Sequence, residues 1–68
     1  MTINKLFGQN LKKYRLRKKY TQEYLAEICG LHRTYISSIE LGKKSPSLQT
    51  IEILANKLEI DIYFLFKY

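Results

Sequence analysis

The sequence predicts a small all-α domain of five short helices. Apolar residues recur in five segments at helical spacing, three or four positions apart, and not at the alternating spacing of strands. The breaks between these segments are short, and they contain Gly30, Gly42 and the only proline, Pro46. A chain of 68 residues leaves room for one domain, which we place over residues 1–68.

Positive charge is concentrated in the first two thirds of the chain. Residues 1–44 carry ten lysines and arginines against three glutamates, a balance of +7, whereas residues 45–68 carry two basic and three acidic groups, a balance of −1. This division predicts a face that binds a polyanion and a separate apolar face that packs. A solvated basic surface that keeps a small protein soluble explains the charge equally well, and a helix lying on a membrane is a third alternative.

Several classes of protein are not expected from this composition. One cysteine cannot form an internal disulfide, and with one histidine it cannot complete a zinc site without other donors. The chain has no glycine-rich phosphate loop, no nucleophile and base at motif spacing and no cluster of metal ligands, so we expect no enzyme, cofactor, metal or small-molecule ligand. No apolar run approaches the ~20 residues that span a bilayer, and the start lacks the apolar stretch of a signal peptide, so we expect a cytoplasmic protein.

The first two predicted helices cover residues 3–18 and a segment that begins after Thr21. Thr21 is the expected N-cap, because its side-chain oxygen can accept a free backbone N–H at the start of the helix. The residues expected to face the core are Ile3, Leu6, Phe7, Leu11 and Tyr14 in the first helix, and Leu25, Ala26 and Ile28 in the second.

The third predicted helix runs from about residue 33 to 40, and the fourth follows Ser47, a second candidate cap. The residues expected to face the core are Tyr35, Ile36 and Ile39, and then Leu48, Ile51, Leu54, Ala55 and Leu58. Residues 60–68 are rich in strand formers, but a lone strand would have no partner, and Asp61 can cap a fifth helix instead. We therefore predict a short helix at the end of the chain.

The second and third segments have the spacing of a helix-turn-helix, which we place at about residues 21–41. Counted from Gln22, position 5 is Ala26, position 9 is Gly30 and position 15 is Ile36. A small residue lets the two helices cross closely, a glycine accepts the positive φ of a tight turn, and a branched side chain holds the second helix on the core. In a basic chain of this length, the combination indicates a DNA-binding motif.

The chain resembles the Cro/repressor-type helix-turn-helix family, also called XRE, over residues 7–66. The stretches that carry the resemblance are Leu11–Arg15, Thr21–Ala26, Gly30–Leu31, Tyr35–Gly42, Pro46–Leu48 and Leu54–Ala55. Residues 33–37, with Ile39 and Glu40, are most similar to the controller proteins of restriction–modification systems. The family implies a five-helix, lambda-repressor-like domain that binds double-stranded operator DNA as a homodimer.

Two positions depart from the family pattern. His32 stands where the family commonly has Ser, Thr or Asp as the cap of the third helix, so it is either a surface residue or a contact to DNA. Leu41 stands where the family often has an arginine, which removes one phosphate contact and leaves the fold unaffected.

If residues 33–40 form the recognition helix, its outward face enters the major groove of the DNA. Arg33 can form two hydrogen bonds to guanine O6 and N7, a contact that discriminates between bases by about 1–3 kcal/mol. Thr34 can reach a base edge with its methyl or its hydroxyl, and small serines allow close approach. The expected base contacts are Arg33, Thr34, Ser37, Ser38 and His32.

Phosphate contacts are expected on either side of this helix. Gln22 begins the preceding helix, where its amide and the free backbone N–H groups suit a phosphate. Lys43 and Lys44 follow the recognition helix and are expected to bind the DNA backbone. Tyr35 either donates its hydroxyl to a phosphate or packs partly in the core.

The resemblance also implies an ion pair between Arg15 and Glu40 that ties two helices together, with Arg15 facing a phosphate as well. The remaining basic residues near the end of the first helix either attract DNA nonspecifically or form a solvated face: Lys12, Lys13, Arg17, Lys18 and Lys19.

The apolar end of the chain is the expected dimerisation region, at about residues 58–68. One recognition helix contacts few base pairs, and two-fold dimers solve this by reading half-sites about 34 Å apart. The end supplies more aromatic surface than a small core needs, so we expect the interface at Ile62, Tyr63, Phe66 and Tyr68. Alternatively, Phe64 and Leu65 complete the core and the rest is half exposed. The alternative function is an antitoxin or a phage-type repressor whose domain also docks a protein partner.

Overall fold

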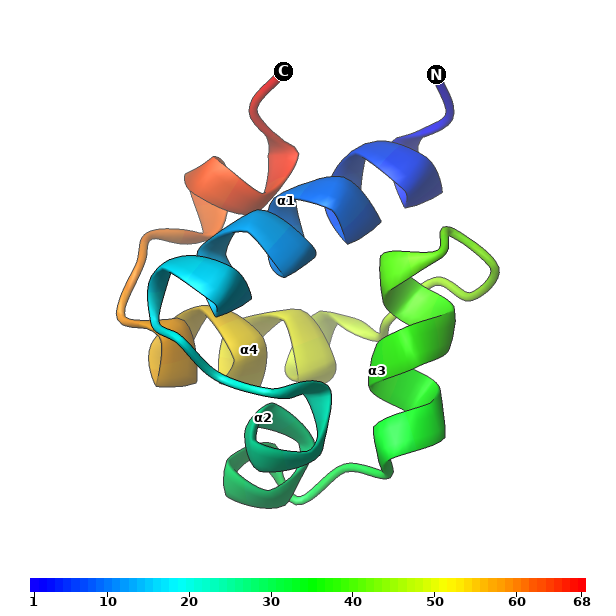
Figure 1. Cartoon of the computed structure of the whole chain (residues 1–68). Coiled ribbons are helices and arrows are strands. Elements are labelled where there is room, and N and C mark those ends of the chain that lie inside the picture. Colours follow the sequence, from blue (N-terminus) through cyan, green and yellow to red (C-terminus); the bar gives the residue numbers. More distant parts are fainter.

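The computed structural model describes all 68 residues. It contains no strand and four α-helices, followed by a 3₁₀ helix: α1 (Ile3–Arg17), α2 (Gln22–Cys29), α3 (Arg33–Glu40), α4 (Leu48–Leu58) and η1 (Ile62–Phe66) (Figure 1). The all-α prediction is confirmed, and the segment expected as a fifth helix is the short 3₁₀ helix.

Three of the α-helices begin at a hydroxyl side chain that accepts the backbone N–H three residues later, at 2.9–3.3 Å: Thr2, Thr21 and Ser47. The caps predicted at Thr21 and Ser47 are therefore confirmed. The cap predicted at Asp61 is wrong, because its carboxylate makes no capping hydrogen bond. Its backbone carbonyl accepts the N–H of Phe64 at 3.0 Å instead, as the three-residue spacing of a 3₁₀ helix requires.

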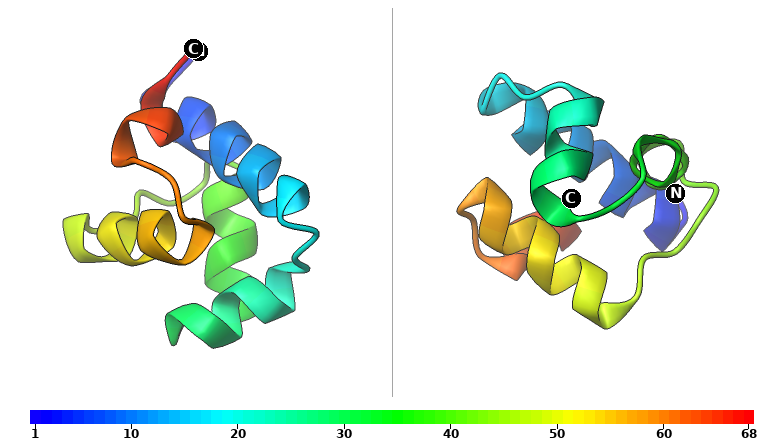
Figure 2. Two further views of the ribbon diagram at one scale, coloured as in Figure 1. Left: turned by 90° about the vertical axis from the view of Figure 1, so that its left-hand side faces the viewer. Right: turned by 90° about the horizontal axis from the view of Figure 1, so that it is seen from below.

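All the helices contribute to one apolar core, whose buried members are Phe7, Leu11, Leu25, Ala26, Cys29, Ile36, Ile39, Leu54, Ala55, Leu58 and Leu65. Two residues expected in the core, Ile3 and Leu48, are 57% and 81% exposed. Each stands at the first position of its helix, where the apolar stripe extends beyond the elements that cover it. The N-terminal end of α4, which carries Leu48, projects from the body of the fold (Figure 2).

The crossing of α1 over α3 depends on Gly8. A Cβ atom at this position would clash with the carbonyl oxygen of Ile39 and would lie 2.7 Å from the carbonyl oxygen of Glu40. Both neighbours are backbone atoms, so no side-chain rotation could make room. The absence of a side chain at Gly8 therefore lets the two helices approach and sets the position of α3 on the core.

Candidate nucleic-acid interface

The third helix has the two faces that the sequence predicts. Ile36 and Ile39 are fully buried, whereas Arg33 and Thr34 are exposed in the first turn. Further along the helix, Ser37 and Ser38 are only half-buried, and Tyr35 packs against the core with part of its side chain in solvent. The first turn of α3 is therefore its most accessible part.

The turn between α2 and α3 is built as the spacing predicts. Gly30 ends α2 in the left-handed conformation, with φ of 68°, and the N–H of Leu31 donates to the carbonyl of Ala26 at 2.8 Å. Ala26 is buried between the helices, and Leu31 packs against the core. This turn fixes α3 relative to α2 and leaves the N-terminal end of α2 exposed at the surface.

Glu40 joins three helices at one buried carboxylate. Arg15 donates from Nε to Oε2 at 2.7 Å and from Nη2 to Oε1 at 3.0 Å, and its Nη1 donates to the carbonyl of Tyr20 at 2.8 Å. Arg15 and Glu40 are 7% and 9% exposed, so this ion pair is part of the interior. Because three of its N–H groups are used within the protein, Arg15 acts first as a link between α1 and α3.

Gln22 takes part in the same network. Its Nε2 donates to Glu40 Oε1 at 3.0 Å, so the side-chain amide is turned toward α3 and not toward solvent alone. The first backbone N–H groups of α2 have no partner within the helix and remain the groups available to an anion. The sequence did not predict this contact, because Gln22 and Glu40 are 18 positions apart and no local pattern pairs them.

His32 is the N-cap of α3. Its Nδ1 accepts the backbone N–H of Thr34 at 3.3 Å, and the hydroxyl of Thr34 lies 2.8 Å from the same nitrogen. Both residues are exposed. The histidine therefore caps α3 as a serine or threonine caps each of the other α-helices, with its ring held at the edge of this helix.

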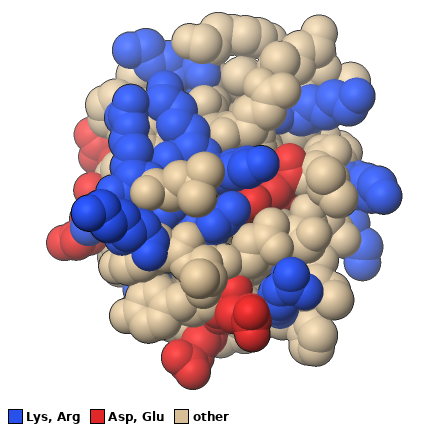
Figure 3. All heavy atoms as spheres, viewed as in Figure 1, with Lys and Arg blue, Asp and Glu red and all other residues tan.

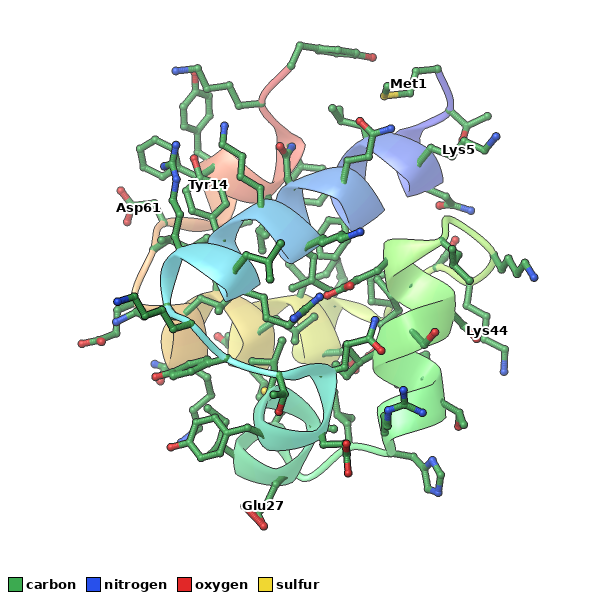
Figure 4. The ribbon with its side chains drawn as sticks, in the orientation of Figure 1. Met1, Lys5, Tyr14, Glu27, Lys44 and Asp61 are labelled. Carbon is green, nitrogen blue, oxygen red and sulfur yellow. The ribbon has the colours of Figure 1, made fainter.

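Basic side chains gather in two places on the face shown in Figure 3. One group lies beside α3 and the loop that follows it, where Lys43 and Lys44 are exposed. Lys5 lies on this side with Lys44 (Figure 4) and approaches Gly42, whose φ is 75°. Sequence reasoning missed Lys5, because its place beside the loop arises from a contact between residues far apart in the chain.

The second basic group lies over the C-terminal half of α1, apart from the start of α3 (Figure 3). Lys13 and Arg17 stand over the ring of Tyr14, at 5.4 and 5.0 Å from its centre. Lys18 forms an ion pair with Glu59, which raises the pKa of Lys18 and lowers that of Glu59 through the hydrogen bond between them.

The residues expected at a dimer interface are mostly exposed. Ile62, Tyr63 and Tyr68 have large exposed fractions, whereas Phe66 is half-buried, with its ring centre 5.2 Å from that of Phe7. An open, mainly apolar pocket of about 310 Å³ lies between α4 and η1, lined by Leu48, Gln49, Ile51, Glu52, Ile62 and Phe66. Leu48 is the member that the sequence misplaced, because helical periodicity alone assigns it to the core.

No three His, Cys, Asp or Glu side chains come together to hold a metal ion. Cys29 is buried, and desolvation raises the pKa of its thiol, so it packs as a small apolar side chain. None of the helices has the length and apolar character that a bilayer crossing requires.

Comparison with known proteins agrees with this arrangement. The family model described as Helix-turn-helix (HTH_3) matches residues 11–65. The control protein C.SmaI of Serratia marcescens is 42% identical over 62 residues, which cover 91% of this chain and 74% of that protein. The restriction–modification controller protein C.AhdI of Aeromonas hydrophila superposes with a TM-score of 0.89 at 40% identity, covering 93% of this chain and 96% of that one.

The structure of one relative has been determined in complex with DNA. SinR, a master regulator for biofilm formation, in complex with DNA, superposes with a TM-score of 0.85 at 35% identity, covering 90% of this chain and 98% of that one. Proteins of this kind are regulators that bind DNA and are not enzymes. The chain therefore belongs to the helix-turn-helix (XRE-type) family of DNA-binding transcriptional regulators, and it is similar to the controller proteins of restriction–modification systems.

Proposed function

We propose that two copies of this chain bind an inverted-repeat operator, each with α3 in the major groove of one half-site. The observation that carries this proposal is the first turn of α3, where Arg33 and Thr34 are exposed while Ile36 and Ile39 hold the helix on the core. Only this end of the helix can reach base edges without exposing the core.

The base contacts in this arrangement come from Arg33 and Thr34 first. The partly covered Ser37 and Ser38 allow the groove wall to come close, and His32 stands at the edge of the helix. Arg33 is the residue that reads a guanine, because its two N–H groups match the O6 and N7 acceptors.

Phosphate contacts surround this helix. The free backbone N–H groups of Gln22 and Glu23 bind one phosphate, helped by the dipole of α2, and Lys43, Lys44 and the hydroxyl of Tyr35 bind others. Arg15 is a positioning residue in this scheme, because its guanidinium is buried against Glu40.

The dimer forms through the apolar surface between α4 and η1. Two copies related by a two-fold axis bring the same patch together, so a projecting Leu48 of each copy can enter the pocket of the other. The interface then includes Ile62, Tyr63, Phe66 and Tyr68, in keeping with the dimerisation region at about residues 58–68. In this scheme η1 is the counterpart of the fifth helix of a lambda-repressor-like domain.

The regulator that fits best is the controller protein of a restriction–modification system, acting in the cytoplasm, where the DNA is. The similarity to C.SmaI and C.AhdI over nearly the whole chain supports this choice over a phage-type repressor or an antitoxin. Genes for a methyltransferase and a nuclease beside this one would support the controller, and a toxin gene in their place would contradict it.

A selection from randomised DNA duplexes tests the proposal. The chain should enrich an inverted repeat, and Arg33→Ala should remove the preference for one base in each half-site. Arg17→Ala is the matched control, because it removes the same charge from the second basic group. Equal loss of affinity for every sequence in both variants, or enrichment of no sequence at all, would contradict the proposal.

A further inference from the structure

The pairing of His32 with Thr34 determines what the edge of the recognition helix can offer to DNA. The other α-helices are capped by a hydroxyl that accepts the N–H three residues later, whereas His32 accepts the N–H two residues later through a ring nitrogen. Histidine is not among the favoured N-caps, so capping alone does not account for this side chain.

The contacts of the ring decide its tautomer. In a neutral imidazole one nitrogen carries a hydrogen and the other accepts. The backbone N–H of Thr34 points at Nδ1, and a backbone N–H can only donate, so Nδ1 must be the accepting nitrogen. The hydrogen of the ring is therefore on Nε2, which no group of the protein bonds, and the ring is exposed.

The same contacts decide the state of the Thr34 hydroxyl. Its oxygen lies 2.8 Å from Nδ1, which carries no hydrogen, so the hydroxyl must donate to the ring. Its only hydrogen is then used, and the lone pairs and the methyl group remain free. Thr34 can accept a hydrogen bond or contact a methyl group, but it cannot donate.

We propose that His32 and Thr34 form one specificity-determining pair, in which His32 Nε2–H donates to a purine edge and Thr34 accepts from a base amino group or contacts a thymine methyl. The acceptor on the purine is N7, which adenine and guanine share. A serine or aspartate in place of His32 has too short a side chain to place a donor where Nε2–H stands. This inference rests on the proposed insertion of α3 into the major groove.

A phosphate oxygen could also accept from Nε2, and the experiment separates the two acceptors. The probe is the duplex that the full chain selects from a randomised pool. At the purine assigned to His32, 7-deazaguanine or 7-deazaadenine removes the N7 acceptor and leaves Watson–Crick pairing intact. This base should weaken binding of the native chain about 10-fold and should not affect His32→Ser, whose shorter side chain has no donor at the position of Nε2.

His32→Ser is the most informative variant, because it introduces a hydroxyl cap of the kind that the other α-helices have. It should therefore fold with unchanged thermal stability. It should lose the purine preference at one position in each half-site and keep the preference that depends on Arg33. If the variant keeps the purine preference, or binds all sequences equally more weakly as loss of a phosphate contact would cause, the inference is wrong. Selection of no sequence by the native chain would instead refute the proposed function.

Thr34→Val tests the second member of the pair, because valine keeps the shape and the methyl group and replaces the hydroxyl. It should relax the preference for an amino-bearing base, such as adenine or cytosine, next to the purine. Two-bond ¹H–¹⁵N NMR correlations of the native ring should show hydrogen on Nε2 and none on Nδ1. The opposite tautomer would overturn the assignment of donor and acceptor.

Discussion

Replacing Gly8 by alanine tests whether the fold depends on the close crossing of α1 and α3. In an exposed helix this change would stabilise the protein by about 1 kcal/mol, because alanine is the better helix former. Here the added Cβ would meet two backbone carbonyls, at 2.7 Å in the case of Glu40. Overpacking of this kind costs typically 1–3 kcal/mol, and the rigid backbone contact places Gly8→Ala at the upper end. The net effect should therefore be a loss of about 2 kcal/mol.

Such a loss is large for this chain, since a domain of this size has a free energy of unfolding of about 3–10 kcal/mol. Thermal unfolding followed by circular dichroism should show a Tm lower by about 10 °C. Gln9→Ala, at an exposed position of the same helix, is the control and should leave the Tm unchanged or slightly higher. A Gly8→Ala chain as stable as the native chain would refute the reasoning, because helix propensity would then outweigh the crossing.

Three further predictions concern charge and assembly. Arg15→Met should cost about 3–5 kcal/mol of unfolding free energy by leaving Glu40 buried without its partner, and Glu40→Leu in the same chain should restore most of it in denaturant titrations. The pKa of Glu59, measured by NMR, should lie below the usual glutamate value and return to it in Lys18→Met. Because the folded-state pKa is the lower one, the ion pair stabilises the fold at pH values above the usual glutamate pKa. This contribution is lost as the pH falls through the folded-state pKa. Leu48→Asp should turn a species of twice 8.1 kDa into a monomer in sedimentation experiments without unfolding it, and a native chain that is monomeric at every concentration would contradict the dimer.

Local sequence determined much of the fold. The caps at Thr21 and Ser47 and the left-handed Gly30 depend on residues within a few positions of one another, so their side-chain chemistry alone predicts them. The exposed first turn of α3 was predicted for the same reason, because Ile36 and Ile39 define the opposite face.

Apart from the Arg15–Glu40 ion pair, which the family resemblance implied, features that depend on distant segments were not predicted. Periodicity placed Leu48 in the core, but whether the first turn of a helix is covered depends on which other elements reach it. A lone glycine within a helical pattern, such as Gly8, indicates close packing. The sequence alone does not show which backbone segment packs against it. The turn of the Gln22 amide toward Glu40 likewise depends on how α2 and α3 cross.

The contacts of the Glu40 carboxylate determine how much of the chain is needed to bind DNA. Its partners come from α1 and from the start of α2, although the residue itself ends α3. A peptide cut to the two helices of the motif would lack Arg15 and would carry an uncompensated negative charge at the end of α3. The smallest fragment able to recognise an operator therefore includes the first helix, and a transplanted motif would need its own substitute for that arginine.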